Sequence, residues 1–202
     1  MTIDTKDLLE SIKKSIGRID YVHPEDIPNI DLYMDQVTTF MEEKLKNTKR
    51  YPDDKVLTKT MINNYSKNNL LPPSNKKKYT KEHVLLLIFV YYFKNILSIK
   101  DIDILLSPIT EKYFATDTDF DMNSIYEEAC KMQKSRVEEL EANIEALYHE
   151  AEDSYADAPE EDRHYLQMFA FICNLAFDVY IKKQLIEKLI DELPEPTKKK
   201  KK

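Results

Sequence analysis

Glycine is almost missing from this chain, which has one glycine among 202 residues and no tryptophan. Rossmann turns and phosphate-binding loops need glycine, because only glycine adopts positive φ freely where the backbone approaches a phosphate. The scarcity therefore excludes the Gly-rich signatures of the commonest kinases, NTPases and dehydrogenases. It also disfavours sheets and predicts a protein that is almost entirely helical.

Cysteines and long apolar runs are also scarce. Cys130 and Cys173 are too few to build a disulfide scaffold. The longest unbroken apolar run covers residues 84–93, which is too short to cross a bilayer, and the first residues have no secretory apolar segment. We expect a reduced, cytoplasmic protein that does not enter a membrane.

Charge is divided unequally along the chain, although the net charge is −7. Residues 44–81 contain eleven lysines and arginines against two acids, whereas residues 111–192 contain eight against 21. This asymmetry suggests that only the first segment meets a polyanion. Runs of charge are also common on solvated faces that bind nothing, and that reading stays open.

Apolar residues recur at helical spacing in most of the chain. We expect helices over residues 5–16, 29–46, 58–67, 81–95 and 98–106, with Gly17 as a C-terminal cap and Pro108 as a stop. After a linker over 107–123, Ser124 and Glu127 form a capping-box pattern that opens a helix to about residue 152. A last helix covers about 160–192. In both of these C-terminal helices, the apolar residues recur at the spacings of a coiled-coil seam. The apolar face of the last helix is wider than one partner helix can bury, which indicates a bundle or a dimer.

The helix at 58–67 is unusually polar. Thr58 can cap it, and Met61, Ile62 and Tyr65 form a narrow inward face. Its outward face carries amide, hydroxyl and lysine groups, which can hydrogen-bond base edges and phosphates in a major groove. The alternative is a polar surface helix that touches nothing. The outward residues are Lys59, Thr60, Asn63, Asn64 and Lys67.

The segment after this helix ends in a cluster of lysines. Pro72 and Pro73 stop the helix, and the adjacent leucines are expected to hold the loop against the core. Lys76, Lys77 and Lys78 then project from the loop, ahead of Tyr79 and the apolar helix. Such a triplet is suited to clamping phosphates, although exposed lysine triplets are common.

Residues 58–106 resemble the MerR-type winged-helix DNA-binding domain. The matching features are Tyr65 and the elements at 69–73, 78–79, 84–93 and 97–102. Asn63, Asn64 and the three lysines stand where that family usually has arginine and a Gly-Tyr-Arg wing. A longer match over most of residues 20–190, including DIPNIDLYMDQVTTF, resembles an uncharacterised family of Gram-positive bacterial proteins that carries a domain of unknown function.

The MerR resemblance implies a transcription regulator that binds duplex DNA as a homodimer. The wide apolar C-terminal bundle could also hold an unidentified small-molecule effector. The implied fold is an all-α, winged helix-turn-helix domain followed by a long C-terminal helical hairpin or bundle. The candidate DNA-contacting residues are Lys55, Thr58, Lys59, Thr60, Asn63, Asn64, Tyr65, Lys67, Lys76, Lys77, Lys78 and Tyr79.

The expected organisation has four parts. An N-terminal helix and connector cover residues 1–28, and the DNA-binding domain covers 29–107. A dimerisation and effector region covers 121–192, and a disordered lysine-rich tail covers 193–202.

Catalytic and metal-binding signatures are weak. The four histidines are scattered, and no HExxH pattern or nucleophile constellation is present. His149 and His164 flank a turn rich in acids, but we interpret these side chains as solvated and Cys130 and Cys173 as packing residues. We therefore expect no enzyme activity, metal or cofactor.

The alternative function is a helical protein-interaction module that keeps the helix-turn-helix as a scaffold without specific DNA binding.

Overall fold

The computed structural model describes residues 5–16, 22–116, 118–134 and 136–195. These residues are mostly helical, with two short strands. The helices are α1 (Thr5–Ile16), α2 (Met34–Leu45), α3 (Lys59–Lys67), α4 (Lys81–Phe93), α5 (Ile99–Tyr113), α6 (Met122–Lys134), α7 (Val137–Glu152) and α8 (Glu160–Asp191). The strands are β1 (Leu32–Tyr33) and β2 (Lys78–Tyr79), and 3-10 turns cover Pro24–Asp26 and Lys46–Thr48.

The chain divides into two compact units. The core unit consists of Tyr21–Lys131 and Glu187–Lys202, and the hairpin unit consists of Met1–Asp20 and Met132–Ile186. None of the described helices is both long and apolar enough to span a membrane.

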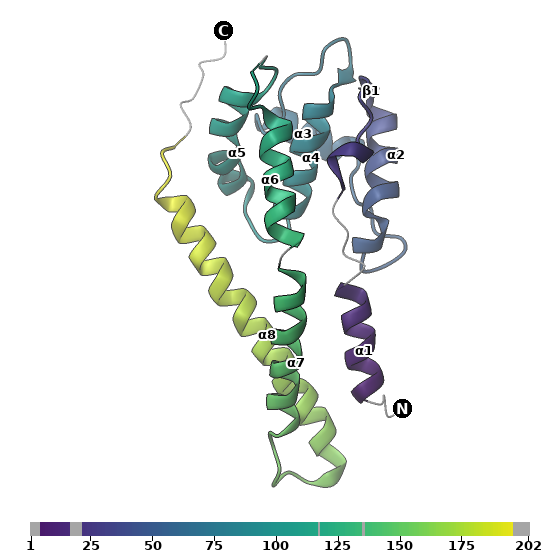
Figure 1. Cartoon of the computed structure of the whole chain (residues 1–202), viewed down its shortest axis with the longest axis vertical. Helices are drawn as coiled ribbons and strands as arrows, with labels where there is room; N and C mark the ends of the chain where they lie inside the picture. Colours follow the sequence, from purple (N-terminus) through teal and green to yellow (C-terminus); the bar gives the residue numbers. More distant parts are fainter. Residues whose placement is uncertain (1–4, 17–21, 117, 135, 196–202) are drawn as a thin grey trace. The chain divides into compact units, whose positions relative to one another are not determined.

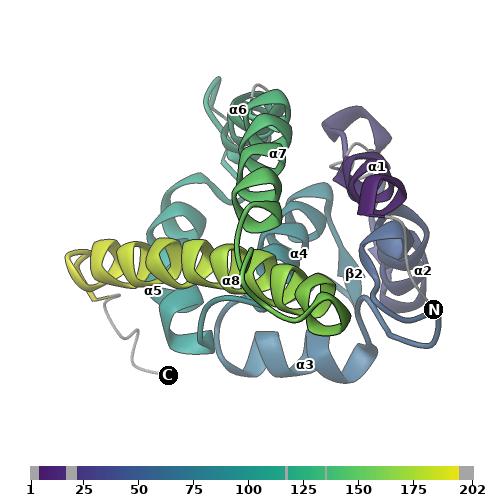
Figure 2. The ribbon, with the colours of Figure 1, turned by 90° about the horizontal axis from the view of Figure 1, so that it is seen from below.

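Helix α4 lies at the centre of the core unit, with α2, α3, α5 and α6 around it (Figures 1 and 2). Its sequence is apolar on all sides, so it needs neighbours around its whole circumference. Its buried residues are His83, Val84, Leu85, Leu86, Leu87, Ile88, Val90 and Tyr91. The predicted core helix is confirmed.

Local caps set the ends of several helices. The Thr58 hydroxyl accepts a hydrogen bond from the Met61 N–H at 3.2 Å, which begins α3 as predicted. Ser98 and Asp101 form a reciprocal capping box at the start of α5. At the start of α4, the Thr80 N–H donates to Nδ1 of His83 at 3.0 Å. Histidine therefore takes the place that Glu or Gln usually holds in this motif.

The helix predicted over residues 29–46 begins five residues later, at Met34. Leu32 and Tyr33 are extended instead and pair with β2 in an antiparallel ladder, Leu32 opposite Tyr79 and Tyr33 opposite Lys78. The Tyr33 N–H donates to Oε1 of Gln36 at 2.8 Å, which satisfies a backbone donor at the helix start. A two-residue strand has too little periodicity to be visible in the sequence.

The prediction that Pro108 ends a helix, and that residues 107–123 form a linker, is wrong for the first part of that segment. Helix α5 continues to Tyr113 with Pro108 in its interior. Proline removes one backbone hydrogen bond, and the exposed ring of Pro108 needs no space inside the core. The apolar residues on both sides, from Ile102 to the partly buried Ile109, keep the helix packed.

The single helix predicted over 124–152 is two helices, α6 and α7. The capping residue is Asp121 rather than Ser124, because Oδ1 of Asp121 accepts from the Ser124 N–H at 2.9 Å, and α6 begins at Met122. The interruption between α6 and α7 falls around Arg136, and Ser135 lies outside the described residues. The predicted four-heptad seam is therefore divided between the two units.

The hairpin unit packs α1 against α7 and α7 against α8. Its buried cluster consists of Leu9, Tyr148, Ala151 and Phe171. An ion pair between Nζ of Lys13 and Oε2 of Glu145, at 3.0 Å, joins α1 to α7. The predictions of helices over 5–16 and 160–192 are confirmed, with α8 ending at Asp191. Cys173 is exposed, so the expectation that it packs in a core is wrong.

Two predictions at chain ends and connectors fall on residues outside the described part. These are the C-terminal cap at Gly17 and most of the lysine-rich tail, from residue 196 onward. Within the described part, the residues with positive φ are Asn69, Lys76, Lys77, Ala115 and Tyr155.

Candidate nucleic-acid interface

Helix α3 presents a polar face to solvent. Thr60, Asn63, Asn64 and Lys67 are exposed, while Ile62 and Tyr65 on the opposite side are buried. The two buried residues fix the rotation of the helix, because turning it would expose them. The orientation predicted from the sequence is confirmed, and the four polar side chains lie along one face.

Helix α2 packs beside α3, and the segment between them is held by Glu42. The Glu42 carboxylate accepts from Nζ of Lys49 at 2.6 Å and from the Val56 N–H at 3.2 Å. The hydrogen bond from Lys49 lowers the pKa of Glu42, with a further contribution from the Val56 N–H. These contacts order the long connection between α2 and α3.

Lys59 at the start of α3 forms an ion pair with Asp35 of α2. Both side chains are exposed, so the pair is worth little to stability. It does place a carboxylate next to the polar face. A phosphate that contacts Lys59 has to compete with Asp35.

A tight β-hairpin turn follows α3. The Lys78 N–H donates to the Asn75 carbonyl at 2.8 Å, and the Asn75 N–H donates to the Lys78 carbonyl at 3.1 Å. The two residues between them, Lys76 and Lys77, have φ of 49° and 64°. Two consecutive residues with positive φ define a type I′ turn, which favours Asn-Gly. Each lysine in this conformation is strained by about 1–3 kcal/mol.

Neighbouring contacts direct the hairpin turn away from the core. Tyr79 is buried in the core, and Tyr33 and Lys78 face each other across the β1–β2 pair. Nζ of Lys78 lies 5.4 Å from the centre of the Tyr33 ring, a cation–π distance. Lys76 and Lys77 are exposed at the tip. Two of the three predicted clamp lysines are thus fully presented to solvent, and Lys78 is half-buried.

His83 lies beneath this hairpin and is 2% exposed. Its ring contacts Tyr79 and Phe114 edge-on, with centroid distances of 5.5 and 4.8 Å. Burial lowers the pKa of His83, and the nearby carbonyls of Pro72 and Pro73 partly oppose this shift. This capping role of His83 is not among the features predicted from the sequence. The spacing of Thr80 and His83, three residues apart at a helix start, was the signal that could have revealed it.

The adjacent Glu82 joins α4 to the end of α5. Its two carboxylate oxygens accept from the Ala115 N–H at 2.9 and 3.0 Å. Burial raises the pKa of Glu82, and the hydrogen bond from Ala115 acts in the opposite direction. Ala115 itself has positive φ, which this contact holds in place.

The other predicted site residues divide into two groups. Lys55 is exposed in the segment before α3. Thr58, Tyr65 and Tyr79 face inward, as a cap or as packing residues, and burial raises the pKa of Tyr65. These three can support an interface by holding α3 and the hairpin in place.

Metal-binding clusters are absent from the part of the chain that the structure describes, where no three His, Cys, Asp or Glu side chains are arranged to hold an ion. His149 instead contacts Glu152, with 3.2 Å between Nδ1 and Oε2. The chemistry that the α3 face and hairpin turn offer is therefore hydrogen bonding and positive charge.

By fold, the core unit is an α-helical domain that carries a small antiparallel β-pair and a lysine-tipped turn. Residues 22–129 match the family model described as "Domain of unknown function (DUF1836)". This match covers more than half of the chain, and the protein belongs to that family. No curated protein and no solved structure matches the chain.

Proposed function

We propose that this protein is a cytoplasmic DNA-binding transcription regulator of MerR-like type, within a family of Gram-positive bacterial proteins. In this proposal α2 and α3 form the helix-turn-helix, and the hairpin turn at residues 75–78 is the tip of the wing. The order of β1, α2, α3 and β2 supports it, as does the pairing of β1 with β2.

The conformation of Lys76 and Lys77 is the observation that carries the proposal. A type I′ turn built for stability has Asn-Gly at these positions. Two lysines there make the turn less stable and place two positive charges at its tip. Strained residues of this kind cluster where a ligand is held. A phosphate backbone is the ligand that such a tip fits best.

Base contacts would come from the exposed face of α3. Asn63 and Asn64 can pair bidentately with adenine, and Lys67 can reach guanine or phosphate. The absence of arginine on this face removes the commonest bidentate contact to guanine. We therefore propose recognition that relies on the amides of α3 for sequence and on the hairpin lysines for affinity.

A homodimer is part of the same proposal. In the hairpin unit, α8 exposes a series of large apolar residues that no described segment of that unit covers. They are Tyr165, Phe169, Ile172, Phe177, Val179, Tyr180, Ile181 and Leu185, with Tyr165 71% exposed. Exposed apolar surface of this extent marks an interaction site.

Charge along α8 favours an antiparallel partner of the same kind. The helix begins with Glu160, Glu161 and Asp162, whereas its second half mixes Lys182, Lys183 and Lys188 with Asp178, Glu187 and Asp191. Antiparallel pairing of two copies brings the acidic start of one helix beside the lysines of the other. Two-fold symmetry would then present two α3 faces to two half-sites.

Sequencing of genomic DNA co-purified with the protein tests the proposal. We expect enrichment of a pseudo-palindromic duplex. Changing both Asn63 and Asn64 to Ala should weaken the preference for that site by roughly 1–3 kcal/mol per lost base pair contact, without changing the salt dependence. Recovery of random fragments, or an unchanged preference in the Asn variant, would contradict base reading by α3.

The exposed apolar face of α8 also favours a second candidate, a helical protein-interaction module. This function predicts that partner binding survives replacement of Lys76, Lys77 and Lys78 by Ala. It also predicts that binding is lost when exposed apolar residues of α8 become polar. A pull-down with both sets of variants separates the two candidates.

A further inference from the structure

Tyr33 is an exposed aromatic residue on the outer face of the β1–β2 pair. It lies opposite Lys78, while the adjacent residues Leu32 and Tyr79 are buried in the core. Neighbouring residues of a strand point to opposite faces, so Tyr33 and Lys78 share the face that is turned away from the core. Tyr33 is 54% exposed, and its ring therefore adds little to the core of this unit.

The ring of Tyr33 holds an ammonium group that has no anionic partner. Nζ of Lys78 lies 5.4 Å from the centre of the ring. Neither Lys78 nor its neighbours Lys76 and Lys77 form an ion pair with a carboxylate of the described residues. A cation–π contact at an exposed site is weak, so the ammonium of Lys78 stays available to an anion that approaches the ring.

Tyr33 also lies between the two groups of proposed DNA-contacting residues. It is the residue before α2, and through Lys78 it adjoins the hairpin turn. Asp35, in the first turn of α2, pairs with Lys59 at the start of α3. The start of α2 is thus connected to the hairpin turn on one side and to α3 on the other.

Positive charge prevails around Tyr33. Two carboxylates lie near it in the chain: Asp35, which is paired with Lys59, and Asp31, whose charge acts on His83 beneath the hairpin. The four lysines at 59 and 76–78 outnumber them. A polyanion is therefore attracted to this part of the core unit.

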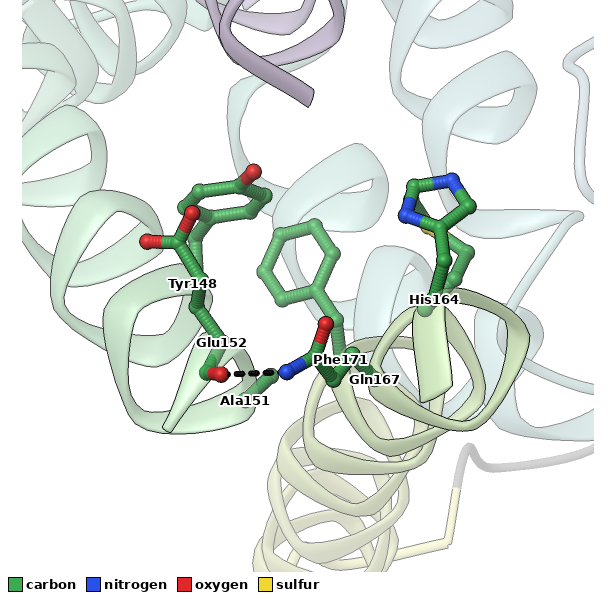
Figure 3. A pocket seen from close by; sticks show the side chains of 7 residues that line it. Tyr148, Ala151, Glu152, His164, Gln167 and Phe171 are labelled. Atoms are coloured by element: carbon green, nitrogen blue, oxygen red, sulfur yellow. Dashed lines mark hydrogen bonds between the residues drawn. The ribbon is translucent and has the colours of Figure 1, made fainter. Parts of the chain in front are cut away.

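The hairpin unit offers no comparable place for a polyanion in its cavity between α7 and α8 (Figure 3). The lining of this cavity includes Glu152 and no lysine or arginine. The amide of Gln167 is used within the unit, because its Nε2 donates to the Glu152 carbonyl (Figure 3). An additional nucleic-acid contact is therefore better placed at Tyr33 than in this cavity.

We propose that Tyr33 and Lys78 together bind one deoxyribose-phosphate unit of duplex DNA. The ring of Tyr33 packs against the sugar, and its hydroxyl and the Lys78 ammonium donate to the same phosphate. Tyrosine suits this role because it combines an apolar body with a polar tip, and tyrosine side chains are among the usual partners of the DNA backbone. Every nucleotide carries a sugar and a phosphate, so this contact adds affinity without sequence preference.

This inference rests on the proposed function and names a contact of the same DNA interface. It differs from the contacts of Lys76 and Lys77 in being only partly electrostatic. The contribution of Tyr33 should therefore not depend on salt, since its side chain carries no charge.

The first test is fluorescence anisotropy of the full-length protein with a labelled duplex of about 30 base pairs. We expect Tyr33→Ala to bind at least about fivefold more weakly, with an unchanged salt slope. Tyr33→Phe keeps the ring and loses the hydroxyl, so its affinity should lie between those of the wild type and Tyr33→Ala. Phe120→Ala is the matched control, because Phe120 is also 54% exposed in the core unit but lies outside the lysine-rich segment. Its affinity should equal that of the wild type.

The shared phosphate predicts coupling between the two side chains. If Tyr33 and Lys78 hold one phosphate, the double variant Tyr33→Ala/Lys78→Ala should weaken binding by less than the product of the two single effects. Single effects that simply multiply overturn the shared contact.

The ring also stabilises the hairpin through Lys78, so the thermal midpoint of each variant is measured as well. A lowered midpoint with unchanged affinity in Tyr33→Ala means that the ring serves stability only, and it overturns the proposal. Where both values fall, photocrosslinking decides. We expect p-benzoylphenylalanine at position 33 to form an adduct with the duplex on irradiation, and the same residue at position 120 to form none.

The two proposals fail in different ways. A wild type that binds duplex DNA, together with no adduct at position 33, overturns the Tyr33 contact alone. A wild type that binds no duplex DNA contradicts the proposed function, and the contact with it.

Discussion

Lys76 and Lys77 show at the scale of single residues how the proposed DNA contact and the stability of the turn oppose each other. Both have positive φ, a conformation that glycine and asparagine adopt with far less strain. The hydrogen bonds between Asn75 and Lys78 close the turn around them. The sequence reveals the lysine triplet, but it cannot reveal this strain, because nothing in a Lys-Lys-Lys run indicates a type I′ turn.

The double variant Lys76→Asn/Lys77→Gly should therefore be more stable and bind DNA less well. We expect its free energy of unfolding in urea to rise by about 1–3 kcal/mol, because the relief of strain at both positions exceeds the extra backbone entropy that glycine loses on folding. The slope of log affinity against log salt concentration should become shallower by about two units per protomer.

The matched control is Lys131→Ala, which removes an exposed lysine that is not a predicted phosphate contact. It should leave the salt slope unchanged. A lower stability of the double variant would contradict the strain argument, and an unchanged slope would contradict phosphate contact by the hairpin.

His83 predicts a pH dependence of stability. Burial lowers its pKa below the ordinary value of 6.5, so the folded protein binds the proton less tightly than the unfolded chain. The contribution of neutral His83 to the free energy of unfolding is therefore fully present above about pH 6.5, and it decreases as the pH falls below that value. Protonation would also remove the acceptor that caps Thr80.

Urea unfolding measured between pH 5 and 8 checks this, with His83→Gln as the comparison. Glutamine keeps a capping acceptor and does not titrate. The partly buried carboxyl of Glu82, with its raised pKa, contributes with the opposite sign near the acid end. Because Glu82 is present in both proteins, the difference between them isolates His83. Identical pH profiles would rule out the predicted role.

At the scale of elements, the sequence predicts helices well where caps and apolar runs coincide. Thr58 and Ser98 begin α3 and α5 as expected, and the apolar run of α4 forms the core. It predicts poorly where a strong local signal is outweighed by tertiary packing, as at Pro108. The boundary between α6 and α7 was also missed, because apolar spacing continues across it while the chain does not form one helix.

Helix α5 provides a test of that explanation. Pro108→Ala restores a backbone N–H within the helix and removes the proline ring, so it should raise the free energy of unfolding by about 1–3 kcal/mol. Urea denaturation measures the change. A decrease in stability would mean that α5 depends on a proline-induced bend for its packing.

At the scale of the whole molecule, the account depends on self-association through α8. Ile172 is exposed near the middle of this helix, where two antiparallel copies would meet. We expect sedimentation to show a dimer for the wild type and a monomer for Ile172→Glu, because two buried carboxylates would face each other across the symmetry axis.

Lys131→Gln is the control for that experiment, since it changes charge at an exposed position outside α8. It should leave the dimer unchanged. If the wild type is a monomer at all concentrations, the apolar face of α8 serves another partner, and the second candidate function gains support.

Salt dependence of duplex DNA binding tests the central claim most directly. Fluorescence anisotropy with a labelled duplex of about 30 base pairs needs no knowledge of the recognised sequence. If Lys55, Lys76 and Lys77 contact phosphates in both protomers, affinity should fall by about a thousandfold between 50 and 200 mM salt. Absence of binding at the lower salt concentration, or an affinity that does not change with salt, would contradict the account.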